Sequence, residues 1–120
     1  MNGRAAIYLD RFFGGLLALA AAGHTAGTFA FYQWPSEVFV WSLGASLAGF
    51  LLAAINLLRV NRPSDRMLAW ICAGSLGWLA LVSAFGIVIG HLLDPRVLMH
   101  AAAAAGLTVM SVRTLTTSRY

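Results

Sequence analysis

The chain has 120 residues, of which 60% are hydrophobic and only 10% are charged. Soluble domains carry about 25% charged residues, so this composition argues against a soluble globular fold. The high apolar content also excludes a disordered chain, and the single cysteine excludes a disulfide-stapled one. The composition therefore predicts an integral membrane protein whose first partner is the lipid bilayer.

Four apolar stretches follow one another along the chain, separated by short connections that each contain a proline. The stretches are 12–33, 38–58, 67–91 and 97–115. Each has the approximately 20 residues that a helix needs to cross the hydrocarbon core of a bilayer. Short connections make consecutive helices antiparallel neighbours. We therefore predict an all-α fold, an antiparallel up-down four-helix transmembrane bundle that forms a single domain over residues 1–120.

The ends of these helices carry recognisable signals. Residues 1–11 alternate apolar and charged side chains, which predicts a short interfacial segment before the first helix. Ser64 is the expected N-cap of the third helix, and Asp94 that of the fourth, with Pro95 at its first position. The first apolar stretch is longer than the core of a cleaved secretory signal, so it is expected to remain as a helix.

The net charge of +4 comes from eight arginines and four acidic residues, with no lysine. The arginines lie singly or in short clusters at the ends of the apolar stretches, which argues against nucleic-acid binding and indicates topology signals. Seven flank one side of the predicted bundle: Arg4, Arg11, Arg59, Arg62, Arg66, Arg113 and Arg119. Only Arg96 lies on the other side. This asymmetry predicts a bacterial inner-membrane protein with both termini in the cytoplasm.

Small residues at helical spacing predict where helices meet. Gly23 and Gly27 form one GxxxG pair and Gly86 and Gly90 another, a pattern that lets membrane helices approach closely. Two further pairs of small residues have the same spacing: Ala45 with Gly49, and Ala102 with Gly106. The Gly23–Gly27 face is expected to contact another helix, within the protomer or between protomers. Trp78, in the middle of its stretch, is expected to be a packing residue.

Several kinds of chemistry lack the residues that they need. No charged residue is expected near the middle of a span, which argues against an ion pump or a proton-coupled antiporter. Cys72 has no partner for thiol redox chemistry, and no serine lies in a nucleophile motif. We therefore predict no catalytic residues, and a protein that is not an enzyme is the favoured interpretation.

Three histidines remain as candidate ligands. His24 and His100 project from small-residue faces and could hold a haem b iron, although their expected depths differ by roughly 8 Å. His91 and His100 share a depth, and with Asp94 or Glu37 they could instead bind a transition metal. A third possibility is that each histidine only forms a hydrogen bond to a neighbouring helix.

Two other functions stay open. The chain could be a non-catalytic accessory subunit of a larger membrane complex, or one that forms homo-oligomers through its glycine faces. It could also be a small lipid- or quinone-binding enzyme, with a histidine as base and Arg96 holding an anionic headgroup. Convergence of His24 and His100 on a cavity would favour cofactor binding. Outward-facing glycines around a filled interior would favour the accessory subunit.

Overall fold

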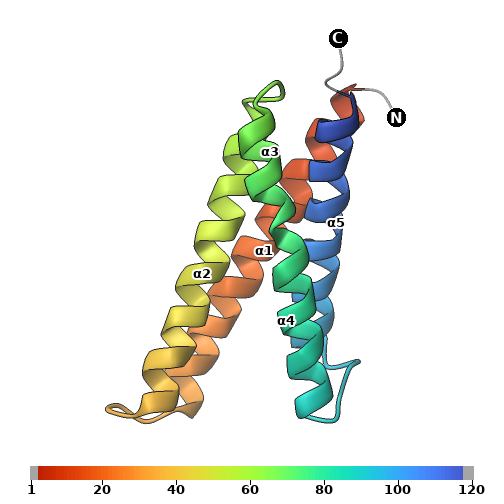
Figure 1. Cartoon of the computed structure of the whole chain (residues 1–120). Helices are drawn as coiled ribbons and strands as arrows, with labels where there is room; N and C mark the ends of the chain where they lie inside the picture. The colour runs from red at the N-terminus through yellow and green to blue at the C-terminus, as the bar shows by residue number, and fades with distance from the viewer. Residues whose placement is uncertain (1–2, 118–120) are drawn as a thin grey trace.

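The computed structural model describes residues 3–117, and in this part of the chain every regular element is an α-helix (Figure 1). The helices are α1 (Gly3–Phe31), α2 (Glu37–Val60), α3 (Arg66–Ala73), α4 (Ser75–Val88) and α5 (Pro95–Thr117). α3 and α4 follow each other along one rod, interrupted only at Gly74, so the described chain forms four rods. All four are long and apolar enough to cross a membrane. The all-α class and the four predicted apolar helices are confirmed.

Two predicted boundaries differ from the structure. α1 begins at Gly3, so the residues of the expected interfacial segment that the structure describes belong to one continuous helix. The reason is that Ala6 and Asp10 are buried and extend its packed face towards the N-terminus. α4 ends at Val88 rather than at residue 91, because Gly90 has a φ of +69° and closes the helix in a left-handed turn. Residues 1–2 lie outside the described part.

The helix caps agree with the sequence in part. Asp65, not Ser64, caps α3, and its side chain accepts a hydrogen bond of 2.9 Å from a backbone N–H in the first turn. Asp94 accepts a hydrogen bond of 2.9 Å from the backbone N–H two residues on. Pro95 is the first residue of α5, as expected.

Close packing occurs at one glycine of the GxxxG pairs, Gly86, where a Cβ would lie 3.1 Å from a side-chain carbon of Val97 in α5, and at two glycines outside these pairs. A Cβ on Gly49 of α2 would lie 3.2 Å from the Cβ of Ala21 in α1, and a Cβ on Gly106 would collide with the ring of Phe13. In contrast, a Cβ on Gly23 would meet nothing within 4 Å in the described structure. The predicted contact of the Gly23–Gly27 face is therefore not made within the protomer.

The four rods pack unevenly along their length. α2 packs on α1 and α3, whereas α4 packs on α5. Figure 1 shows α2 and α3 close together near the termini, while α2 and α4 diverge towards the other end of the molecule. We call the end with the termini and the 61–65 loop the closed end, and the end with the 32–36 and 89–94 loops the open end. The apolar core lies between them and is formed by Leu17, Ala53, Ala103 and Leu107.

Candidate ligand site at the open end

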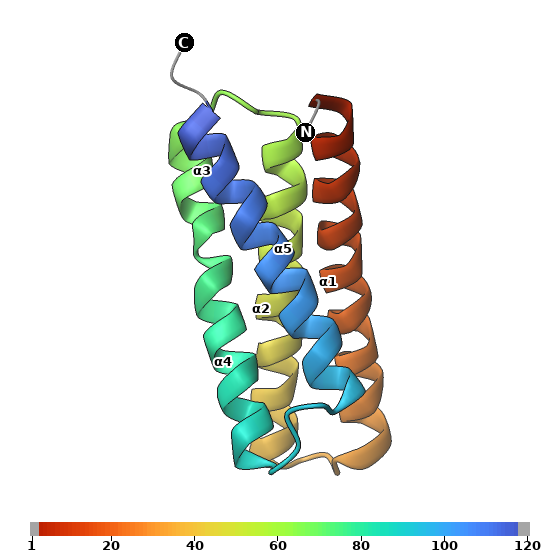
Figure 2. The same cartoon turned by 90° about the vertical axis from the view of Figure 1, so that its right-hand side faces the viewer.

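His24 of α1 and His100 of α5 are brought together, as the cofactor hypothesis requires. Their ring centres lie 6.4 Å apart and the ring planes are 87° to each other. The surrounding face of both helices is built from buried alanines, including Ala21 and Ala104, which let the helices approach closely. Figure 2 shows that α5 is inclined to α1. The sequence predicts different depths for His24 and His100 in parallel, straight helices, and this inclination compensates for the difference.

A chain of hydrogen bonds runs from His24 through Ser42 to Thr28. The Thr28 hydroxyl donates to the His24 carbonyl at 2.9 Å. Its oxygen therefore accepts the single proton of the Ser42 hydroxyl, 2.6 Å away. The oxygen of Ser42 is left to accept from Nε2–H of His24, at 3.1 Å. In the tautomer that donates to Ser42, the lone pair of His24 is on Nδ1, to which no group of residues 3–117 is hydrogen-bonded.

His100 is half-buried and is held by a tryptophan. The indole Nε1 of Trp78 lies 3.4 Å from Nδ1 of His100. An indole N–H can only donate, so Nδ1 of His100 carries the lone pair and Nε2 carries the proton. Trp78 is thus a packing residue, as predicted, and also a hydrogen-bond donor. At 3.4 Å this bond is long and easily replaced.

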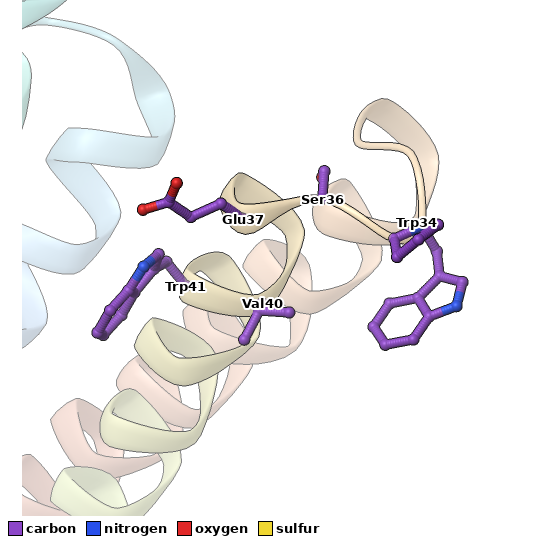
Figure 3. Close-up of a pocket in the computed structure, with 6 residues that line it drawn as sticks. Trp34, Ser36, Glu37, Val40 and Trp41 are labelled. Carbon is purple, nitrogen blue, oxygen red and sulfur yellow. The ribbon is translucent and has the colours of Figure 1, made fainter.

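An open cleft of about 370 Å³ lies next to His24, between α2 and α4. Its polar wall is formed by His24, Ser42 and Glu37, and its aromatic wall by Tyr32, Trp41 and Phe85. A second, shallower depression of about 450 Å³ follows the 32–36 loop, and it shares Glu37 and Trp41 with the cleft (Figure 3). His24 therefore borders a cleft at the open end, and His100 lies directly behind it.

The residues of the predicted metal site are spread more widely. His91 and Asp94 are neighbours in the 89–94 loop, but Asp94 is engaged by the side chain of Arg96 at 2.7 Å. These hydrogen bonds, together with the backbone N–H of Arg96, hold the pKa of Asp94 well below its usual range. Within residues 3–117, no three histidine, cysteine or acidic side chains lie close enough together to bind a metal ion. The structure does not gather His91, His100, Asp94 and Glu37 into one site.

Sequence reasoning missed a buried ion pair at the closed end. Arg59 was expected in a connection, as a topology signal, but it lies within α2 and is only 1% exposed. Its guanidinium forms two hydrogen bonds with Asp10 of α1 and donates to Thr114 of α5 at 2.9 Å. Asp10 lies near the start of α1 and Arg59 in the last turn of α2, so this pair is away from the middle of the spans, where no charged residue was expected. Helical spacing after the buried Ala53 and Asn56 could have indicated that Arg59 faces inwards.

The closed end is tied together by further polar contacts. Asn56 is fully buried and donates to the Ser75 hydroxyl at 3.1 Å, which joins α2 to α4 beside the interruption at Gly74. The Cys72 thiol donates to the Ile55 carbonyl at 3.5 Å and joins α3 to α2. Comparison with protein-family models, with curated proteins and with solved structures finds no match to this chain.

Proposed function

We propose that this chain is an integral membrane protein that holds a transition-metal centre between His24 and His100. The observation that carries the proposal is the 6.4 Å between the two ring centres. Metal–nitrogen bonds of about 2 Å place the centres of two ligating imidazoles roughly 5–6.5 Å apart. Imidazole is a common ligand of copper, zinc, nickel and iron.

The hydrogen bonds around both rings support this proposal. Nδ1 of His24 has an available lone pair, and Nδ1 of His100 is occupied only by the long contact from Trp78. A metal ion could replace that contact without breaking the chain through Ser42 and Thr28. Binding should therefore change the environment of Trp78, which gives a fluorescence signal.

Two metal centres share this ligand chemistry, a bare ion and a haem iron. A bare ion requires one nitrogen of each ring within about 2 Å of a common point. A haem held by both imidazoles would need room for its macrocycle between them. The macrocycle would have to extend into the cleft or separate the alanine-lined contact of α1 and α5. The packing favours the bare ion, and both are tested.

The test is titration of the metal-free protein in a neutral detergent with Co²⁺, Zn²⁺, Cu⁺ and haemin. We expect one equivalent of a bare ion to bind and to alter Trp78 fluorescence, with no change in Trp78→Phe. His24→Ala and His100→Ala should each weaken binding at least tenfold, whereas the matched control His91→Ala, at an exposed histidine, should not. A Soret band lost in the same two variants would identify haem. Equal losses in all three variants, or no stoichiometric binding, would overturn the proposal.

A second role is favoured by a separate observation, the outward direction of Gly23 and Gly27. A Cβ on Gly27 would reach only Phe31 of the same helix, at 4.0 Å, and one on Gly23 would meet nothing within 4 Å. An uncovered GxxxG face suits close packing against a helix of another protomer or another subunit. On this interpretation the protein forms homo-oligomers or joins a larger membrane complex.

We further propose an orientation in a bacterial inner membrane, with the closed end and both termini in the cytoplasm. Arg59 no longer counts as a flanking charge because it is paired inside the bundle, and Arg119 lies outside the described residues. Without Arg59, and with Arg119 counted from the sequence, six arginines lie on the cytoplasmic side and Arg96 alone lies on the other. Reporter fusions after residues 60 and 120 should both report the cytoplasm, and a periplasmic signal from either would reverse the orientation.

A further inference from the structure

The open-end cleft combines one carboxylate with three aromatic rings. Glu37 is the first residue of α2, and Trp41 follows one helical turn later. Figure 3 shows that both side chains project to the same side of α2, while Trp34 lies on the opposite side. Tyr32 and Phe85 complete the aromatic wall. We propose that this cleft binds a lipophilic quaternary cation, such as a tetra-substituted ammonium or phosphonium ion.

The charge of the cleft supports a cationic occupant. At the same end of the bundle, the guanidinium of Arg96 is paired with Asp94 by contacts of 2.7 and 2.9 Å. Within residues 3–117, Glu37 takes part in no ion pair. Glu37 lies in the first turn of α2. The cleft thus offers one negative charge that no side chain of the described protein neutralises.

The aromatic rings suit the body of the ligand. Trp41 is 72% exposed and Phe85 50% exposed, so both rings are available to a bound molecule. A cation placed over aromatic faces is attracted by their quadrupoles, and quaternary ions are recognised in this way because they cannot donate hydrogen bonds. The volume of about 370 Å³ is within the range of small-molecule sites.

This cation site is independent of the proposed metal centre. Its binding groups are Glu37, Tyr32, Trp41 and Phe85, none of which is a proposed metal ligand. His24 borders the cleft, but its Nε2 is directed to Ser42. Loss of metal binding would therefore leave the cation site intact, and loss of cation binding would leave the metal centre intact.

The experiment measures binding of tetraphenylphosphonium to the metal-free full chain in a neutral maltoside detergent at low salt. Equilibrium dialysis at fixed micelle concentration separates binding from partition into micelles, and triphenylphosphine oxide serves as the neutral analogue. We expect the cation to bind at least tenfold more tightly than the neutral analogue. Glu37→Gln should remove most of this preference.

Two tryptophans provide a matched pair of variants. Trp34 and Trp41 are 71% and 72% exposed, but only Trp41 lines the cleft. Trp41→Ala should weaken cation binding about fivefold, in keeping with a cation–π contact at an exposed ring, whereas Trp34→Ala should change it less than twofold. Circular dichroism of each variant verifies that it is folded.

The shared quaternary chemistry could come from a free organic cation or from the choline headgroup of a lipid. Competition by lysophosphatidylcholine, but not by lysophosphatidylglycerol, would identify the headgroup, and the absence of competition would identify a free cation. Equal affinity for the cation and its neutral analogue would overturn the proposal. So would unchanged affinity in a folded Glu37→Gln protein.

Discussion

The two ends of the bundle place polar groups among apolar helices in opposite ways. At the closed end, Arg59 and Asp10 are charged, buried and paired, and the guanidinium also donates to Thr114. At the open end, His24 and His100 are hydrogen-bonded to Ser42 and Trp78. His24 borders a cleft that also contains the carboxylate of Glu37, which is in no ion pair within residues 3–117. The difference shows that buried, paired charges join helices, whereas polar side chains beside a cleft leave a site that can bind a ligand.

The apolar core keeps these two regions apart. Leu17, Ala53, Ala103 and Leu107 are all 1% exposed or less and lie between the ion pair and the histidines. A dry layer of this kind offers no polar group to relay a proton or an ion along the bundle. We therefore expect substitutions at one end to leave the properties of the other end unchanged.

The largest effect is expected from breaking the closed end. Arg59→Met should destabilise the protein by about 3–5 kcal/mol, because it leaves the Asp10 carboxylate buried without its partner. The double variant Asp10→Asn/Arg59→Met should recover a substantial part of this loss. Reversible unfolding in mixed detergent, followed by circular dichroism, measures both changes.

Arg62→Met is the control, because Arg62 is exposed just beyond α2. It should change the free energy of unfolding by less than about 0.5 kcal/mol. An Arg59→Met protein as stable as this control would contradict a structural role for the ion pair.

An intermediate effect is expected from glycines that differ only in what they face. Gly49→Leu should cost about 1–3 kcal/mol, because the new side chain would push against Ala21 and Trp78. Gly44→Leu, in the same helix with nothing within 4 Å, should be neutral or slightly stabilising. Thermal unfolding in detergent distinguishes the two, and equal destabilisation would argue against the described packing.

Gly23→Leu distinguishes the stability of the protomer from its ability to form oligomers. Its fold should be as stable as that of the Gly44→Leu protein, since neither glycine is covered within the chain. If the Gly23–Gly27 face packs between protomers, the same change should lower the crosslinked dimer fraction at least threefold. An unchanged dimer fraction would remove the support for an oligomer through this face.

The smallest effect is expected at the 89–94 loop. The pKa of Asp94 is lowered by its hydrogen bonds with Arg96, so the folded state favours the ionised carboxylate. Its contribution to stability is present at neutral pH and is lost as the pH falls below the ordinary carboxyl range, towards the lowered pKa. Asp94→Asn should therefore slightly lower the melting temperature at pH 7 and have no effect at low pH. An equal change at both values of pH would show that the charge is not involved.

Some features could be predicted from the sequence because they depend on local or one-dimensional properties. The thickness of a bilayer sets the length of an apolar helix, so hydropathy alone located all four rods. Asp94 and Pro95 marked the start of α5 because capping and a fixed φ involve only neighbouring residues. The candidate ligands His24 and His100 could be chosen because polar residues on small-residue faces indicate helix contacts.

Other features were decided only when the helices packed together. Gly90 has the spacing of a packing motif, but its positive φ makes it the end of α4. Arg59 has the position of a topology signal, but Asp10 and Thr114 on two other helices make its burial possible. Whether His24 meets His100 depends on the angle between α1 and α5, and the cleft depends on how far α2 and α4 diverge. Such angles result from the shapes of all the side chains in contact, and no short segment of sequence contains that information.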